Sequence, residues 1–268
     1  MKSLKEQIAE LQAMGYSELL ASAKAVHDVV LLAISRSGFK THGTLKGGVV
    51  MSALTKDIRR ATLDMDIDFI HHPITDAGVK RFVARLAKSI PEVVIATQGR
   101  IIDLKHADYK GKRIFLVVKD ESVPRGIKTK LDRGVHVHEK IKQIDICFDV
   151  PSVEGCANLQ ANPVEQIFAE KLLSLLRHGV VTNRPKDVFD LYYLSGTVSI
   201  RKMKTCMREL IYENKRCRAN DKPDVLRMLD IIFAARSFLR RLDNAKANWL
   251  HVAPEEAIAG IRRLITRL

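Results

Sequence analysis

The segment at residues 63–70, Leu-Asp-Met-Asp-Ile-Asp-Phe-Ile, alternates apolar and acidic side chains. A period of two residues predicts a β-strand with one buried face, and it places Asp64, Asp66 and Asp68 together on the opposite face. Asp is a poor strand former, and like charges on one strand face repel each other. The pattern therefore predicts either a solvated strand face or a cation held among the carboxylates.

Strand patterns and helix patterns are segregated along the chain. Further strands are predicted at 92–97, 100–106, 113–119 and 142–149. Helical spacing covers 3–36 as two helices, 47–54 and 76–89, and then 163–178, 186–195, 199–216, 223–241 and 254–267. Pro151, Gly155 and Pro163 mark the change of texture. We therefore predict an α+β fold, with a mixed sheet in a domain at residues 1–155 and a helical domain at residues 156–268.

A third carboxylate lies on the predicted strand at 142–149, where Asp145 stands between Ile144 and Ile146. If this strand is the neighbour of 63–70, Asp145 converges with Asp64 and Asp66. Oxygen donors of this kind suit Mg²⁺, with Mn²⁺ as the alternative. In a two-metal site such ions lower the pKa of an attacking hydroxyl and neutralise a triphosphate and its leaving pyrophosphate.

Two consecutive glycines, Gly47 and Gly48, precede the predicted short helix at 47–54. Glycines at a helix N-terminus let backbone amides approach phosphate oxygens, and the helix dipole favours the anion. A glycine pair alone is weak evidence, because most such pairs are simple turns. Its position just before a strand with two alternating aspartates is a more specific indication of a phosphate site.

The composition favours a polyanionic partner. The chain has 45 Lys and Arg against 31 Asp and Glu, a formal net charge of +14, and a positive field of this size attracts nucleotides and nucleic acid. The segment 123–142 is basic, includes His136 and His138, and has little apolar content. It is predicted to be a solvated loop, with an RNA-facing surface as the alternative.

No apolar run approaches the roughly 20 residues that a membrane-spanning helix needs. The N-terminal residues lack the continuous apolar core of a signal peptide, so a cytoplasmic protein without a membrane partner is expected. The four cysteines form no metal-binding pattern and are expected to be free thiols, namely Cys147, Cys156, Cys206 and Cys217.

Four motifs together resemble the AbiEii/AbiGii-type toxin nucleotidyltransferases, a family that includes the MenT-type toxins. They are Leu45-Lys-Gly-Gly-Val-Val-Met51, Arg60-Ala-Thr-Leu-Asp-Met-Asp66, Glu165-Gln-Ile-Phe-Ala-Glu-Lys-Leu-Leu173 and Arg184-Pro-Lys-Asp-Val-Phe-Asp-Leu191. The resemblance covers roughly residues 40–195. It implies a nucleotidyltransferase domain of the DNA-polymerase-β type, followed by a helical C-terminal region.

The resemblance also implies roles for single residues. Gly47 and Gly48 would bind the triphosphate, Asp64 and Asp66 would hold metal, and Lys171 and Asp187 match later positions needed for activity. Val49 departs from many relatives, which carry a hydroxyl residue there, and Ser52 or Thr62 is the candidate replacement in the nucleotide site.

The residues themselves leave alternatives for the two later positions. Lys171 is otherwise a solvated lysine on an amphipathic helix, and as a functional residue it would meet the triphosphate as a compact point charge. Asp187 is otherwise a first-turn helix residue favoured by the helix dipole, or the partner of Arg184 or Lys186 in a salt bridge.

The predicted function is transfer of a nucleoside monophosphate from an NTP to a hydroxyl acceptor, a tRNA 3′ end, by the toxin of a toxin–antitoxin or phage-defence system with a cognate antitoxin. Two alternatives stay open. One is a nucleotidyltransferase that modifies a protein or a small molecule, and the other is a non-catalytic homologue that binds RNA or the antitoxin.

Overall fold

The computed structural model describes residues 1–70, 74–105, 110–151, 155–243 and 247–268. The chain divides into two compact units. The first contains Met1–Glu139 and Gln143–Asn162, and the second contains Lys140–Lys142 and Pro163–Leu268. The division along the chain thus falls after Asn162 rather than at the expected 155/156, because residues 156–161 form a strand of the first unit's sheet.

The first unit is built on an eight-stranded mixed sheet. The strand order is β3-β5-β6-β2-β1-β8-β7, with β4 paired to β5. The central strand β2 runs parallel to β6 and antiparallel to β1, so the mixed sheet of the predicted α+β fold is confirmed. The strands are β1 (Gly43–Lys46), β2 (Asp64–Ile70), β3 (Val94–Thr97), β4 (Ile102–Lys105), β5 (Lys110–Lys119), β6 (Ile127–His136), β7 (Ile144–Asp149) and β8 (Cys156–Ala161).

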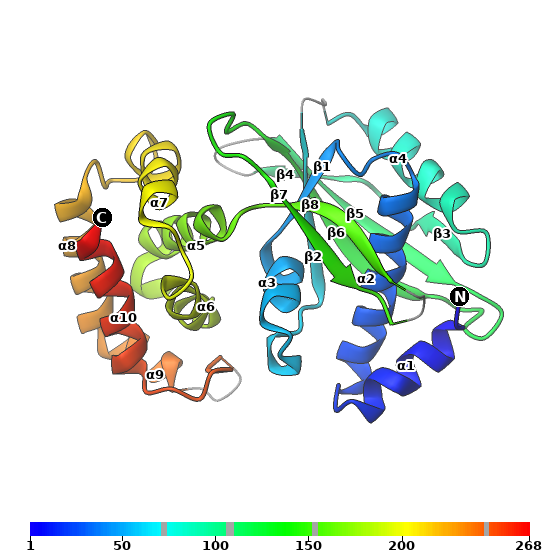
Figure 1. Ribbon diagram of the computed structural model, residues 1–268, viewed down its shortest axis with the longest axis horizontal. Helices are drawn as coiled ribbons and strands as arrows, with labels where there is room; N and C mark the ends of the chain where they lie inside the picture. Colours follow the sequence, from blue (N-terminus) through cyan, green and yellow to red (C-terminus); the bar gives the residue numbers. More distant parts are fainter. Residues whose placement is uncertain (71–73, 106–109, 152–154, 244–246) are drawn as a thin grey trace. The chain divides into compact units, whose positions relative to one another are not determined.

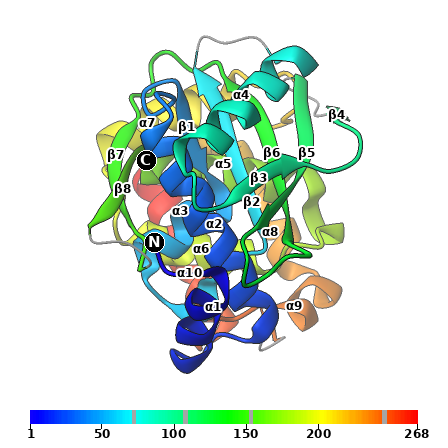
Figure 2. The ribbon, with the colours of Figure 1, turned by 90° about the vertical axis from the view of Figure 1, so that its right-hand side faces the viewer.

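One face of this sheet is covered by helices (Figures 1 and 2). The helical elements of the unit are α1 (Leu4–Ala13), α2 (Glu18–Arg36), α3 (Gly47–Thr55), η1 (Ile58–Arg60) and α4 (Asp76–Ser89). The apolar side of β2 packs here, since the rings of Phe69 on β2 and Phe82 on α4 lie 5.1 Å apart, edge to face. Ser89 at the end of α4 donates a hydrogen bond to the carbonyl of Ala33 on α2. The other face of β2 keeps its aspartates away from this core.

The basic segment 123–142 is not the solvated loop that was expected. Half of it forms β6, which lies inside the sheet between β5 and β2. Its residues alternate, and Thr129, Leu131 and Arg133 are buried. The Arg133 guanidinium lies 3.4 Å from the centroid of the Phe69 ring, and such an aromatic contact lets an arginine occupy an inward position of a strand. The alternation of apolar and polar residues was not recognisable in the sequence, because two of the buried positions of β6 hold the polar residues Thr129 and Arg133.

The expectation of four free thiols is wrong for two of them. Cys147 on β7 and Cys156 on β8 form a disulfide with Cα atoms 5.5 Å apart, whereas Cys206 and Cys217 stay reduced and buried. The antiparallel register sets Cys147 opposite Asn158, which makes Cys156 its diagonal neighbour on the same face. The spacing of the cysteines could not reveal this pair because the strand β8 had not been predicted.

The second unit is helical. Its elements are α5 (Val164–His178), η2 (Gly179–Val181), α6 (Lys186–Ser195), α7 (Ile200–Met207), η3 (Arg208–Tyr212), α8 (Lys222–Ala234), α9 (Arg236–Leu242) and α10 (Pro254–Arg267). The predicted helices at 163–178, 186–195 and 254–267 are confirmed. The two longer ones are divided, by a π-helical turn at Arg208 and by extended backbone at Ala235. No helix within the described ranges is both long and apolar enough to cross a membrane.

Candidate functional site

Carboxylates gather on the open face of the sheet, where β2 lies between β1 and β6. Asp64 and Asp66 of β2 point to this face, and the parallel register sets Asp132 of β6 directly opposite Asp66. Lys46 of β1 is the neighbour of Asp66 on the other side. Residues directly opposite on adjacent strands share one face at close range, so Asp64, Asp66 and Asp132 form one acidic cluster.

Basic side chains surround this acidic cluster. Lys130 Nζ lies 2.7 Å from Asp64 Oδ2. The Arg113 guanidinium binds both oxygens of Asp132, at 2.8 and 2.7 Å. These cations offset the repulsion among the aspartates and fix the orientation of two of the three carboxylates.

Asp68, the third aspartate of β2, is more enclosed than the sequence suggested. It is buried, and its Oδ2 lies 2.6 Å from Lys46 Nζ. Replacing Asp68 would leave the Lys46 ammonium beside fewer counter-charges. Asp68 is best understood as the residue that holds Lys46 next to Asp66.

The pKa of Asp66 is shifted from its ordinary value. Burial raises the pKa of Asp66 to about 6. Lys46 opposes that rise, whereas the neighbouring charges of Asp132, Asp64 and Asp68 add to it. A carboxylate that ionises with difficulty among like charges gains the most from a bound cation, so Asp66 is the centre of the cluster electrostatically as well as geometrically.

The expected convergence of Asp145 with Asp64 and Asp66 is wrong. Asp145 lies on the edge strand β7, and both β1 and β8 separate β7 from β2. Its side chain is exposed and its register partner is Gln160 of β8. The place that sequence reasoning gave to Asp145 is held by Asp132. The alternation of Thr129, Leu131 and Arg133 could have indicated the strand that carries Asp132, but not that this strand pairs with β2.

The glycine pair forms the start of α3 and touches the acidic cluster. Gly47 has φ +63°, and a Cβ placed on it would lie 2.6 Å from Asp66 Oδ2. A Cβ on Gly48 would lie 2.5 Å from Thr62 Oγ1. Neither position can hold a side chain without displacing its neighbour, and Gly47 also needs the left-handed backbone that glycine adopts freely. The N-terminus of α3 therefore meets Asp66 through bare backbone.

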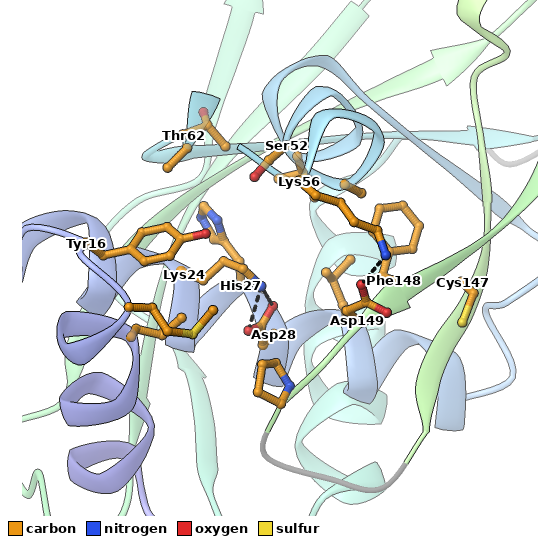
Figure 3. Close-up of a pocket in the computed structure, with 17 residues that line it drawn as sticks. Tyr16, Lys24, His27, Asp28, Ser52, Lys56, Thr62, Cys147, Phe148 and Asp149 are labelled. Atoms are coloured by element: carbon orange, nitrogen blue, oxygen red, sulfur yellow. Dashed lines mark hydrogen bonds and ion pairs between the residues drawn. The ribbon is translucent and has the colours of Figure 1, made fainter. Parts of the chain in front are cut away.

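The two candidate hydroxyl residues differ in their surroundings. Thr62 exchanges hydrogen bonds with the backbone of Asp64 at 3.3 Å, which ties it to the start of β2. Val49 is buried, and Ser52 stands one turn further along α3. Ser52 and Thr62 both line a cavity of about 250 Å³ beside α3, drawn in Figure 3.

The floor of this cavity holds two ionisable residues of α2. Asp28 is buried, and both of its carboxylate oxygens accept a hydrogen bond from Lys24 Nζ, at 2.6 and 2.8 Å. Burial raises the pKa of Asp28 to about 6 and lowers that of His27 to about 4. At the rim, Lys56 lies 3.0 Å from Asp149, and this pair is visible in Figure 3.

In the second unit, Lys171 and Asp187 form an ion pair. Lys171 Nζ lies 2.6 Å from Asp187 Oδ1 and 2.7 Å from Asp190 Oδ2. The alternative of a solvated lysine is thereby excluded, because its side chain is only 12% exposed. Asp187 does lie in the first turn of α6, but the salt bridge found for it is to Lys171 rather than to Arg184 or Lys186.

The acidic cluster consists of oxygen donors beside the glycine pair at the N-terminus of α3. No three His, Cys, Asp or Glu side chains in the described part of the chain are preassembled as a metal cluster, since Lys130 and Arg113 hold Asp64 and Asp132. The donor set is nonetheless made of carboxylates, the ligands that a hard divalent cation prefers. It can hold such a cation if Lys130 gives up its contact with Asp64.

Comparisons with known proteins identify the fold. MenT4, a nucleotidyltransferase toxin from Mycobacterium tuberculosis H37Rv, has the same fold with a TM-score of 0.55, at 14% identity over 98% of this chain and 100% of that chain. JHP933 from Helicobacter pylori gives a TM-score of 0.51 at 14% identity, over 94% of this chain and 93% of that one. The predicted nucleotidyltransferase fold is confirmed. No curated protein sequence matches the chain.

Residues 29–254 match the family described as "Nucleotidyl transferase AbiEii toxin, Type IV TA system". The match spans the glycine pair, β2, β6 and the positions of Lys171 and Asp187. The chain therefore belongs to the AbiEii family of nucleotidyltransferase toxins of type IV toxin–antitoxin systems.

Proposed function

We propose that the active site of this nucleotidyltransferase comprises the glycine pair and the carboxylates of Asp64, Asp66 and Asp132. The contact between Gly47 and the Asp66 carboxylate carries the proposal. It joins the element that can bind phosphate to the element that can bind a cation, so a single triphosphate reaches both. Neither element alone would distinguish this site from a simple turn or a solvated strand.

Mg²⁺, with Mn²⁺ as the alternative, is the proposed cofactor, held by Asp64, Asp66 and Asp132. The fit rests on the donors: three carboxylates on adjacent positions of β2 and β6 offer only oxygen, and Asp66 ionises with difficulty without a nearby cation. The bound cation would supply positive charge to the phosphates and would acidify the acceptor hydroxyl.

The chain's own groups orient the reaction. The amides at the start of α3 are placed to bind phosphate oxygens of the NTP, as helix N-termini do. The acceptor oxygen then bonds to the α-phosphorus, the bond from that phosphorus to the bridging oxygen breaks, and pyrophosphate leaves while the hydroxyl proton goes to solvent. Little covalent work falls to the protein, so positioning and charge stabilisation dominate.

Two hydroxyl residues of the first unit and the Lys171–Asp187 pair of the second unit are the other candidates for nucleotide binding. Thr62 is favoured over Ser52 as the hydroxyl that compensates for Val49, because Thr62 contacts Gly48 and the backbone of Asp64. Lys171 and Asp187 are proposed as the contribution of the second unit to NTP binding and turnover. Their support is the partly exposed ion pair that they form. Asp145 is no longer a candidate for the site.

An RNA acceptor, a tRNA 3′ end, is proposed from charge. The segment 123–142 is a poor RNA surface, because Arg133 is buried and Lys130 binds Asp64. Residues 201–218 are a better one: seven exposed cations there form no ion pair within the described ranges. We call them the α7 basic face, after the helix that carries the first three, while the fourth lies in η3 and the last three follow it: Arg201, Lys202, Lys204, Arg208, Lys215, Arg216 and Arg218.

The charge pattern of the α7 basic face favours phosphate as its partner. Lys204 and Arg208 stand four residues apart where α7 passes into η3, and like charges at this spacing destabilise a helix unless a counter-charge arrives. A phosphate backbone supplies that counter-charge and releases its own counterions on binding. A cytoplasmic site of action and a cognate antitoxin complete the proposal, as the family's type IV toxin–antitoxin role implies.

The test is to incubate the purified protein with each labelled NTP and total cellular RNA, with and without Mg²⁺. Label is expected in RNA of tRNA size, only with Mg²⁺. Label that enters protein or a small molecule instead would favour the rival acceptor class, and no label with any NTP would favour a non-catalytic binding homologue. Expression without antitoxin should arrest growth, and the Asp66→Ala form should be harmless.

A further inference from the structure

Asp190 is a buried carboxylate to which neither the sequence nor the proposed function gives a role. It lies on α6 and is 0% exposed. Its Oδ2 lies 2.7 Å from Lys171 Nζ on α5, and its Oδ1 accepts a hydrogen bond of 3.0 Å from the indole Nε1 of Trp249. With both oxygens engaged and no exposure, Asp190 cannot itself contact a substrate.

Trp249 reaches this carboxylate from the loop between α9 and α10. The indole is 3% exposed, and its ring lies 5.6 Å from that of Tyr193 on α6. Asn248 fixes the loop, because its side chain donates to the carbonyl of Val252 and accepts from the amide of Val252. The donor of the indole is therefore held in place by packing and by the loop, independently of any ligand.

One ammonium thus stands between two carboxylates of unequal exposure. The side chains of Lys171 and Asp187 are 12% and 14% exposed, whereas Asp190 is fully enclosed. A buried ion pair contributes little net stability compared with apolar packing, so stability alone does not account for the enclosed carboxylate. Asp190 holds the Lys171 ammonium from the enclosed side, in addition to the contact with Asp187.

From this arrangement we infer that Asp190, oriented by Trp249, is a positioning residue that sets the Lys171–Asp187 pair for binding the phosphates of the NTP. The inference rests on the proposed role of Lys171 in the function given above. It adds two residues, Asp190 and Trp249, which are 59 positions apart in the sequence and act on the substrate through Lys171.

Asp190→Asn and Trp249→Phe should weaken NTP binding to different extents. Asp190→Asn keeps an acceptor for the indole but removes the charge facing Lys171, and a hydrogen bond to a charged group is the stronger kind. The KM for NTP should rise about tenfold. Trp249→Phe keeps an aromatic ring against Tyr193 and removes only the donor, so a rise of about threefold is expected. In both variants kcat should change less than KM, because the chemistry is carried by the carboxylates of the first unit.

The chain has a single tryptophan, which gives a second readout. The emission of Trp249 should change saturably when NTP binds to the wild type, and Asp190→Asn should need about ten times more NTP for the same change. Asp230→Asn is the matched control, since Asp230 is half-exposed and pairs with Arg262 at a distance from this cluster in sequence. Its KM and emission titration should match those of the wild type.

Unchanged KM values in Asp190→Asn and Trp249→Phe, together with unchanged emission titrations in Asp190→Asn, would overturn the inference. A lower melting temperature with an unchanged KM would do the same, because that result describes a purely structural carboxylate. If Asp190→Asn does not fold, the KM of Trp249→Phe decides alone. Lys171→Met distinguishes failure of the proposed function from failure of the positioning role. A normal KM in Lys171→Met would contradict the role of Lys171 in the proposed function. Loss of NTP binding in Lys171→Met, together with a normal KM in Asp190→Asn, would contradict only the positioning role.

Discussion

Asp132 shows how strand order decides the role of a single residue. It and Asp145 are both aspartates flanked by more buried residues on strands of one sheet, but Asp132 faces Asp66 whereas Asp145 does not. Asp64 and Asp66 could be predicted because their alternation is local. Asp132 could not, because its partnership with Asp66 depends on which strands are neighbours, and no local pattern contains that information.

Asp132→Asn should weaken the binding of Mn²⁺ in the presence of NTP by about tenfold or more, because it removes one charged oxygen ligand from the cluster. Asp145→Asn is the matched control and should bind Mn²⁺ like the wild type. The number and affinity of bound ions can be measured by electron paramagnetic resonance titration. Equal losses in the two variants, or a loss in Asp145→Asn alone, would show that the ion lies elsewhere.

His27 and Asp28 give the unfolding free energy a testable pH dependence. The folded pKa of Asp28 is raised from 3.8 to about 6, so its contribution is present below about pH 4 and is lost as the pH rises towards 6. The folded pKa of His27 is lowered from 6.5 to about 4, so its contribution is present above about pH 6.5 and is lost as the pH falls to 4. Between pH 4 and 6 the two effects oppose each other.

Asp28→Asn should therefore expose the dependence of His27 alone. The unfolding free energy of the variant is expected to rise by roughly 3 kcal/mol from pH 4 to 6.5, relative to the wild type's flatter profile. Urea unfolding across this range measures it, and His27→Gln should give a slope of the opposite sign. Parallel profiles for the wild type and Asp28→Asn would show that Asp28 is ionised equally in the folded and unfolded states.

Among the elements, those with a clear period were predicted and those with polar inward residues were not. The helix at 76–89 was predicted with the bounds that α4 has. β6 was missed because Thr129 and Arg133 occupy two of its buried positions, and β1 because its four residues are too few to show a period. These strands lie on either side of β2, so their absence from the prediction is what misplaced the third carboxylate.

The start of α3 can be tested by adding a single carbon atom. Gly48→Ala should raise the KM for NTP by about tenfold or more, because the new Cβ would stand 2.5 Å from Thr62 Oγ1 and push the turn away from its place. Adding Thr62→Gly to Gly48→Ala removes the clash but also the hydroxyl proposed for the nucleotide site, so only part of the affinity should be recovered. A normal KM in Gly48→Ala would mean that this turn does not bind the triphosphate.

For the whole molecule, the net charge of +14 was readable from the sequence but its useful location was not. Charged residues count equally in a composition, whether they are buried like Arg133, paired like Lys130 or exposed like Lys204. Only the folded structure shows which charged residues are exposed and available to a partner. The same limit applies to the disulfide Cys147–Cys156, which depends on the pairing of β7 with β8.

The triple variant Arg201→Glu, Lys204→Glu and Arg208→Glu should weaken tRNA binding and should leave NTP binding unchanged. If these residues neutralise about three phosphates, the slope of log affinity against log salt should become shallower by about 2 to 3. The control carries three charge reversals on the exposed side of α4, at Lys80, Arg81 and Lys88. Equal loss of affinity and slope in both triple variants would show that the general charge, rather than the α7 basic face, attracts RNA.

The central claim is that the Asp66 carboxylate beside the glycine pair is the catalytic centre. The most direct measurement is the rate of labelled nucleoside monophosphate transfer by the wild type, Asp66→Asn and Asp145→Asn, each with Mg²⁺ and with the metal chelated. The account predicts equal rates for the wild type and Asp145→Asn with Mg²⁺, rates at least about 100-fold lower for Asp66→Asn, and no transfer after chelation. A folded Asp66→Asn variant that transfers at the wild-type rate would contradict it.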